Sequence, residues 1–362
     1  MHHTLAVSYL GLGAWDKALP QADAALALAR QRLGEHNLTT ALMYHTVGEV
    51  LFKQEKPKEA IPNYRHSLDI YQELAPTDSM RYTIQNNLSS SELNAGLRDE
   101  ALRDTQAAVN GFRSLPGHEP DLGLALCDLA TTYRQLGNVE LEEKTGKESI
   151  DVLRRLSDPP VNFGTCLNNR ALLLQDIGHN DESLVVITEA ITFTRQRVGN
   201  TYTELANMLS IRSDLQRMLH HYTEARADIE EALAVALKNY PRDHEWPQYI
   251  LYMYGKLHCD PGVHEYEQGI AKLKESLQKR RPNLPPDDLQ IAAMDFALGR
   301  CLVPLHREKE AEPPLAEAIR IRAKRFGKDA AATKRATDLY RQVLSARSLK
   351  VNPDEALALA LK

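Results

Sequence analysis

A six-residue pattern recurs along the chain at a nearly constant spacing of 41 to 44 residues. It starts with a glycine or a polar residue, continues with polar and acidic residues, and usually ends on a small one. Its last positions are Ala18, Ala60, Ala101, Glu142, Ser183, Ala225, Gly269 and Ala311, and a loop insertion precedes the seventh. A repeat of this length predicts a solenoid, in which each unit packs only on its neighbours.

Each unit is predicted to consist of two amphipathic helices joined by the six-residue pattern. Apolar residues recur at helical spacing before the pattern, as at Leu126, Leu129 and Tyr133, and after it, as at Ala225 and Ile229. The pattern itself suits a turn, because glycine ends helices and acidic residues favour a helix start. The predicted fold class is therefore all-α.

Small residues recur seven positions apart at the start of the second helices. Ala18 and Ala25 form one such pair, and Ala225 and Ala232 and also Ala311 and Ala318 form others. Alanines at this spacing predict a close crossing of two helices, where a larger side chain would overpack at a cost of about 1–3 kcal/mol.

Composition excludes several classes of protein. The 362 residues are 43% hydrophobic, which is enough for a large buried core, and the net charge is −5. Because no basic stripe is visible, we expect no nucleic-acid partner. No apolar run approaches the roughly 20 residues that span a bilayer, so we expect no membrane insertion within the chain.

The four cysteines, Cys127, Cys166, Cys259 and Cys301, each lie inside a helical pattern and form no CxxC pair. This arrangement argues against a disulfide framework and against a zinc site. We therefore expect buried thiols in a reducing compartment.

The repeat resembles the tetratricopeptide repeat. The signature residues are Tyr44-x-x-Val47-Gly48-x-x-Leu51 followed by Ala60-x-x-x-Tyr64, with similar sets at Leu126–Tyr133 and at Leu298-Gly299-x-x-Leu302. The unit is longer than the standard 34 residues, and it looks like the variant found in kinesin light chains and many bacterial regulators. The resemblance implies a right-handed superhelix of about eight helix-turn-helix units over residues 1–325.

Both ends of the chain depart from a regular unit. Met1 falls near the third position of a repeat, so the first unit is predicted to be truncated, which suggests a piece of a longer protein or an incomplete repeat. Residues 326–362 are predicted to form a capping helix over Asp329–Leu344 and then a short helix or tail from Asn352-Pro353.

Some core-type positions carry polar or charged residues. Glu142 replaces a small residue, Glu92 a tyrosine, and Arg170 and Arg212 stand where Leu or Val normally packs, with Gln216 nearby. A buried charge is costly unless it is paired. Two alternatives remain open here: the arginines extend along the helix to water, or repeats 5 and 6 contain a polar seam that acts as a site or a joint.

In tetratricopeptide proteins the first helix of each pair lines the concave face, so the resemblance implies a partner-binding groove made of first-helix side chains. Its candidate residues are His45, Glu49, Phe52, Asn86, Ser90, Asn94, Asp128, Thr131, Arg134, Asn168, Asn169, Gln175, Asp176, Asp214, Arg217, Tyr249, Tyr252, Lys256, Phe296 and Arg300.

This mixture of amides, charges and aromatic rings suits an extended peptide, whose backbone the amides can bind. Asn86-Asn87-Leu88 resembles the Asn-Asn-Leu motif by which kinesin-light-chain-type repeats hold a peptide backbone, and Asn168-Asn169 matches it in part, because Arg170 replaces the leucine. The Lys/Asn clamp that cochaperones use for a terminal carboxylate is not found.

No P-loop, dinucleotide-binding glycine fingerprint, GxSxG or HExxH motif is present in the sequence. Acidic pairs such as Glu230-Glu231 lack a converging partner. We therefore expect a non-catalytic protein with no cofactor and no metal.

The closing stretch FGKDAAATKRATDLYRQV is similar to the ends of bacterial Ser/Thr kinases that carry tetratricopeptide domains. This similarity implies a regulatory or sensing domain that binds a protein or peptide and is covalently joined to an upstream enzyme. The alternatives are a stand-alone adaptor or assembly scaffold, and a sensor of a peptide or small ligand. The expected location is cytoplasmic, or extracytoplasmic if the domain belongs to a membrane-anchored kinase.

Overall fold

The computed structural model describes residues 1–347 and 352–361, and every regular element within them is a helix. The chain divides into two compact units, Met1–Leu173 (unit 1) and Leu174–Lys362 (unit 2), with the division inside α9 (Phe163–Asp176). The other helices of unit 1 are α1 (His2–Gly11), α2 (Trp15–Leu33), α3 (Leu38–Lys53), α4 (Pro57–Leu74), α5 (Met80–Asn94), α6 (Arg98–Arg113), α7 (Glu119–Gln135) and α8 (Val139–Arg154). Unit 2 contains α10 (Asn180–Val198), α11 (Thr203–Met218), α12 (Tyr222–Asn239), α13 (Glu245–His258), α14 (Tyr266–Arg280), η1 (Arg281–Asn283), α15 (Leu289–Leu302), η2 (Val303–Leu305), α16 (Glu308–Phe326), α17 (Ala331–Ala346) and α18 (Pro353–Ala360).

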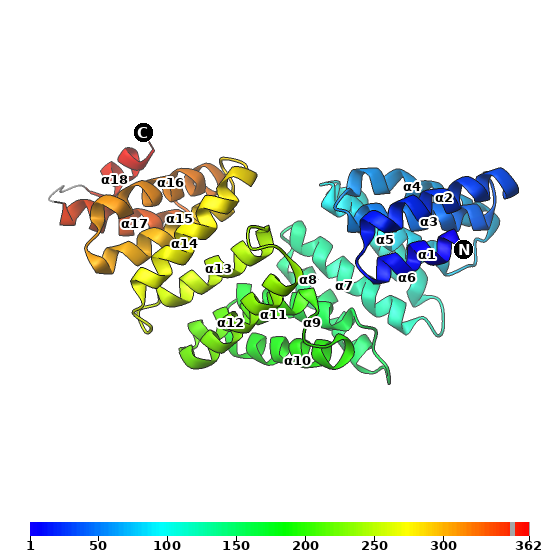
Figure 1. The fold of residues 1–362 in the computed structure, drawn as a ribbon, viewed down its shortest axis with the longest axis horizontal. Helices are drawn as coiled ribbons and strands as arrows, with labels where there is room; N and C mark the ends of the chain where they lie inside the picture. The colour runs from blue at the N-terminus through cyan, green and yellow to red at the C-terminus, as the bar shows by residue number, and fades with distance from the viewer. Residues whose placement is uncertain (348–351, 362) are drawn as a thin grey trace. The chain divides into compact units, whose positions relative to one another are not determined.

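Successive helices pack on each other within each unit (Figure 1). In unit 1, α1 packs on α2, α3 on α4, α5 on α6 and α7 on α8, and each second helix also contacts the next first helix as far as α7. In unit 2, α11 packs on α12, α13 on α14 and α15 on α16. The predicted all-α fold of helix-turn-helix repeats is confirmed.

The turn between the two helices of a repeat contains one residue in the left-handed conformation. These residues are Gly13, Glu55, Gly96, Gly137, Gly178, His220, His264 and His306, with φ between 55° and 84°. All eight lie in or next to the six-residue pattern, so the sequence period is also a backbone period. Four of the eight are not glycine and adopt this conformation at an energetic cost.

The small signature residues of the repeat allow its two helices to pack closely. A Cβ on Gly48 would lie 2.9 Å from the ring of Tyr64, so the glycine of α3 makes room for the tyrosine of α4. Gly299 stands in the same relation to Leu315, at 2.5 Å. Ala18, as predicted for a close crossing, is fully buried.

The C-terminal segment also forms the helices that the sequence indicated. Helix α17 covers Ala331–Ala346 and packs on α16, as a capping helix would. Asn352 caps α18, because its side chain accepts the backbone N–H of Glu355 while the Glu355 carboxylate accepts the N–H of Asn352. Residues 348–351 and 362 of the predicted segment lie outside the described residues.

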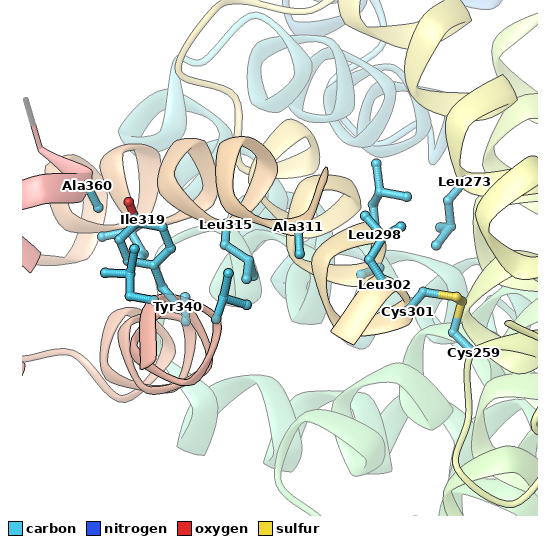
Figure 2. Packing of buried hydrophobic residues seen from close by; sticks show 14 of the residues in the cluster. Cys259, Leu273, Leu298, Cys301, Leu302, Ala311, Leu315, Ile319, Tyr340 and Ala360 are labelled. Carbon is cyan, nitrogen blue, oxygen red and sulfur yellow. A yellow bond between two sulfur atoms is a disulfide. The ribbon is translucent and has the colours of Figure 1, made fainter. Parts of the chain in front are cut away.

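The C-terminal core of unit 2 joins α13–α18 through buried side chains (Figure 2). Leu298 and Leu302 of α15, Leu315 of α16 and Tyr340 of α17 belong to this one buried cluster. A disulfide between Cys259 and Cys301 joins the C-terminal ends of α13 and α15 at one side of this core, with Cα atoms 5.0 Å apart.

The expectation of free buried thiols is wrong. Cys127 on α7 and Cys166 on α9 form a second disulfide within unit 1, with Cα atoms 5.6 Å apart, so no described cysteine is free. The prediction failed because it looked for closely spaced cysteine pairs. The partners are 39 and 42 residues apart, which is about one repeat, and residues one repeat apart lie beside each other on neighbouring first helices.

The two core-type arginines do not extend to water. Arg212 on α11 makes two hydrogen bonds of 2.6 Å to the carboxylate of Asp228 on α12, and the two side chains are 16% and 8% exposed. Arg170 on α9 is 10% exposed and has Glu143 of α8 at 3.5 Å. Of the two alternatives, this burial contradicts extension of the arginines to water, whereas the role of a polar seam as a site or a joint stays a prediction.

The remaining exceptions to the repeat pattern are buried too. Burial raises the pKa of Glu92 to about 7, although Arg65 of α4 lies 2.8 Å from its carboxylate. Glu142 is buried with Arg134 at 4.0 Å, and Gln216 is also buried. Glu92 and Glu142 therefore each have an arginine partner, and for Glu92 the effect of burial is the larger one.

Among residues 1–347 and 352–361, no helix is both long and apolar enough to cross a bilayer.

Candidate functional site

Polar side chains of neighbouring first helices contact each other directly in unit 1. Asn87 of α5 lies 3.0 Å from Nε2 of His45 on α3, and Asn86 donates its amide to Asp128 of α7 at 2.6 Å. Both contacts join residues 42 positions apart, so each first helix presents this polar side to the next.

The same side continues to α9, where the amide of Asn169 lies 3.3 Å from the hydroxyl of Thr131 on α7. On α3, the Glu49 carboxylate lies 3.6 Å from Nδ1 of His45. We call this set the unit 1 ladder: His45, Glu49, Asn86, Asn87, Asp128, Thr131 and Asn169. Most predicted groove residues of unit 1 are thus brought together, and several already bond to each other.

The two carboxylates of the unit 1 ladder are poorly compensated. Burial raises the pKa of Asp128 to about 6, and the Asn86 amide opposes this only in part. Burial also raises the pKa of Glu49, with a small opposing effect from Lys53. Burial lowers the pKa of His45 to about 4, so this imidazole is neutral at pH 7 and supplies no charge.

Other predicted residues of unit 1 lie around the ladder without joining it. Phe52 packs against the core of α1–α5, and the hydroxyl of Ser90 bonds to the backbone oxygen of Asn86. Asn94 is exposed, and Asn168 is buried. Arg134 is turned towards Glu142 of α8.

A small cavity lies behind the ladder, beside the Cys127–Cys166 disulfide. It has a volume of about 50 Å³ and is lined by parts of Thr131, Asn169 and Arg170. This volume suits one or two water molecules and is far below that of a drug-sized ligand pocket.

Unit 2 has a charged chain of contacts on its first helices. Asp214 of α11 accepts Lys256 of α13 at 3.1 Å and Arg217 at 2.9 Å, and Arg217 reaches on to Asp260 at 2.8 Å. Burial raises the pKa of Asp214, but the two cations outweigh it and hold the value at about 2. On α9, Gln175 lies 3.5 Å from Asp214, whereas Asp176 is exposed.

Aromatic rings continue this chain along α13. Lys256 lies 5.7 Å from the ring centre of Tyr252, whose ring is 6.3 Å from that of Tyr249. The guanidinium of Arg280 lies 5.6 Å from the Tyr249 ring. Tyr249 and Arg280 line an open pocket of about 300 Å³ together with Trp246.

Two further arginines lie on α15 and α16. Arg322 of α16 stacks 4.4 Å from the ring centre of Phe296 on α15. Burial lowers the pKa of Arg300, also on α15, and repulsion from Arg217 adds to this. We call this set the unit 2 strip: Asp214, Arg217, Trp246, Tyr249, Tyr252, Lys256, Asp260, Arg280, Phe296, Arg300 and Arg322.

Sequence reasoning missed four residues of the strip. Trp246 belongs to a first helix but was not chosen, and Asp260 lies just after one. Arg280 and Arg322 come from second helices, on which no groove residue was sought. The spacing of 43 residues between Arg217 and Asp260 is a signal that could have identified Asp260, because residues about one repeat apart lie side by side.

Two family models match the chain. The tetratricopeptide-repeat model matches residues 1–73, and a model described as anaphase-promoting complex subunit 5 matches residues 82–213 and 200–260. The chain therefore contains tetratricopeptide repeats, which the family model matches over residues 1–73.

A kinesin light chain-related protein of Arabidopsis thaliana (KINESIN LIGHT CHAIN-RELATED 2) is 22% identical to this tetratricopeptide-repeat chain over 195 residues. The match covers 53% of the chain but only 29% of the plant protein. The chain is thus similar to a kinesin light chain-related protein over about half of its own length, and it spans less than a third of that relative.

Solved structures share the fold of this tetratricopeptide-repeat protein. BtubC (BKLC) from P. vanneervenii has a TM-score of 0.52 at 19% identity and covers 63% of this chain and 93% of its own. The apo form of the quorum sensor NprR from B. thuringiensis has a TM-score of 0.63 at 13% identity, covering 96% and 86%. A Rap protein complexed with Competence and Sporulation Factor has a TM-score of 0.57 at 13% identity, covering 99% and 98%. At under 20% identity, these likenesses show that the chain shares the helical-repeat fold.

Proposed function

We propose that this chain is a non-catalytic scaffold that binds an extended peptide, or an extended segment of a partner protein, along its first helices. The observation that carries the proposal is the unit 1 ladder, in which amides and carboxylates of α3, α5, α7 and α9 follow one another at the repeat spacing. Such a row offers polar contacts at regular intervals, as an extended backbone requires.

The unit 2 strip supports the same proposal with different chemistry. Tyr249, Tyr252 and Trp246 offer apolar surface beside an open pocket, and Lys256 and Arg280 add charge at its edges. Aromatic and arginine side chains supply much of the binding energy at protein interfaces.

We also propose a protein to which this chain is joined. The similarity of the C-terminal stretch to kinase-associated domains supports a regulatory domain joined to an upstream Ser/Thr kinase. A stand-alone adaptor is the alternative. A peptide sensor is a further candidate, favoured by the fold likeness to NprR and to the Rap complex over nearly the whole chain.

The two disulfides bear on the compartment. Disulfides form and persist mainly in oxidising compartments, and both described pairs join helices of the folded repeats. Of the two predicted locations, we therefore favour the extracytoplasmic one over the cytoplasmic one.

Selection from a library of displayed random peptides tests the binding proposal. The full chain should enrich a set of related peptides, and Tyr249→Ala should weaken their binding at least tenfold while the chain keeps its helical circular dichroism. Val185→Ala serves as the matched control, because Val185 is a 69% exposed apolar residue on the second helix α10. Enrichment of no peptide, or equal losses for both variants, would overturn the proposal.

A further inference from the structure

Asp128 has an unusual balance of hydrogen-bonding partners. One of its carboxylate oxygens accepts the Asn86 amide at 2.6 Å. Within the described parts of the chain, the carboxylate has no ion pair, and the amide of Asn86 is the single group that favours its charged form. Asp128 is half-buried, and a carboxylate withdrawn from water in this way normally gains a cation or several donors, so this site lacks a donor.

Asn86 adds a second acceptor to the same place. Its amide nitrogen must point at Asp128, because the opposite orientation would set two oxygen atoms against each other. This leaves Oδ1 of Asn86 buried and with no hydrogen-bond partner. A buried amide oxygen without a donor is costly, and together the two residues offer acceptors that the protein itself does not fill.

Asp214 in unit 2 shows how this chain satisfies a comparable carboxylate. It also lies on a first helix, but Lys256 and Arg217 both reach it, at 3.1 and 2.9 Å. The pKa of Asp214 is about 2, whereas that of Asp128 is about 6. The two aspartates therefore differ by the presence of cations, which the unit 1 ladder does not supply.

A second carboxylate lies further along the unit 1 ladder. Glu49 of α3 has the neutral His45 at 3.6 Å, and His45 contacts Asn87, the chain neighbour of Asn86. The exposed Lys53 acts on Glu49 only at a distance. The ladder thus presents two carboxylates on α3 and α7, with two asparagines of α5 between them.

We propose that the unit 1 ladder recognises a basic side chain, Lys or Arg, of an extended peptide, with Asp128 and Asn86 as its acceptors and Glu49 as a second position for positive charge. This inference rests on the proposed function and specifies the class of peptide. The ammonium or guanidinium group would supply the donors that Asp128 and Asn86 lack.

The test uses acetylated and amidated peptides, so that no terminal charge contributes. A random peptide is first selected on the full chain, and each Lys or Arg in it is then replaced by norleucine or citrulline. One replacement should weaken binding to the wild type at least tenfold. It should have little effect on binding to Asp128→Asn, because the carboxylate that binds the cationic side chain is then absent.

Two controls separate the possible outcomes. Asp128→Asn preserves the size of the side chain, and its thermal midpoint should not fall. Val185→Ala alters an exposed residue of α10 outside the ladder and the strip, and should leave the preference for the basic residue unchanged. If selected peptides bind but show no basic preference, or if Asp128→Asn keeps that preference, this inference fails while the proposed function stands. If no peptide binds at all, the proposed function itself fails. If free amino-terminal peptides bind through their terminus and acetylation abolishes binding, the assignment to a side chain is wrong.

Discussion

Arg212 and Asp228 form a bidentate ion pair between α11 and α12, with both hydrogen bonds at 2.6 Å. The pair occupies a position where most tetratricopeptide repeats place an aliphatic residue. Arg212→Leu should therefore destabilise unit 2 by about 3–5 kcal/mol, because it leaves the Asp228 carboxylate buried without its cation. Urea unfolding followed by circular dichroism measures the change.

The double variant Arg212→Leu with Asp228→Leu is the control for this prediction. Replacing both partners by apolar residues should recover most of the lost stability, since no unpaired charge remains. A single variant as stable as the wild type would show that Asp228 does not depend on Arg212.

The left-handed turn residues predict a stabilising substitution. Glu55 is exposed and has φ of 61°, whereas Gly137 has φ of 73° at the equivalent turn two repeats later. Glu55→Gly should raise stability by about 1 kcal/mol, because glycine adopts this conformation without the steric cost. Gly137→Ala should lower stability by a similar amount. Thermal melts of the two variants should shift in opposite directions, and shifts of the same sign would contradict the assignment.

Each disulfide should stabilise the repeats that it joins. The pairs are separated by 39 and 42 residues, and closing a loop of that length contributes at most about 4 kcal/mol by restricting the unfolded chain. Reductant should lower the thermal midpoint of the wild type and should have no effect on a variant with all four cysteines replaced by serine. Mass spectrometry of unreduced peptides should find Cys127 linked to Cys166 and Cys259 to Cys301. Four reactive thiols in the unfolded, unreduced protein would contradict this.

The raised pKa of Asp128 predicts that the difference in stability between the wild type and Asp128→Asn depends on pH. The pKa of Asp128 is about 6 in the fold against 3.8 in the absence of the fold, so the native state binds more protons between these values. The stability of the wild type should then rise as the pH falls from about 6 to about 4. Groups such as Glu92 are present in both proteins and cancel in the comparison.

Asp128→Asn should therefore be more stable than the wild type at pH 7, by up to about 3 kcal/mol, and the advantage should vanish near pH 4. Unfolding in urea at several pH values measures the difference. An advantage that does not change with pH would show that the carboxylate is not the cause.

Much of the fold follows from the sequence because the repeat is encoded locally. The six-residue pattern marks each turn. Gly48, which leaves space for the ring of Tyr64, belongs to the sequence motif of the repeat. The position of α17 was also predictable, since its apolar residues have helical spacing. These features depend on residues within one repeat.

Contacts between repeats were harder to predict. Cys127 and Cys166, or Arg217 and Asp260, meet because equivalent positions of neighbouring first helices lie side by side. A helix pattern does not contain this information, although the repeat spacing of the partners does. Arg212 pairs with Asp228 because the two side chains meet between α11 and α12. The helical pattern does not show this contact, so the sequence left open whether Arg212 extends to water or belongs to a polar seam.

The most direct test of the account is to locate a bound peptide. A peptide selected on the full chain is made with a photoreactive residue at successive positions, cross-linked, and the products are mapped by mass spectrometry. The account predicts cross-links to first helices, at ladder helices α3, α5 and α7 or at strip helices α11, α13 and α15. Cross-links confined to the second helices α4, α6, α8 and α12, which carry no ladder or strip residue, would contradict it.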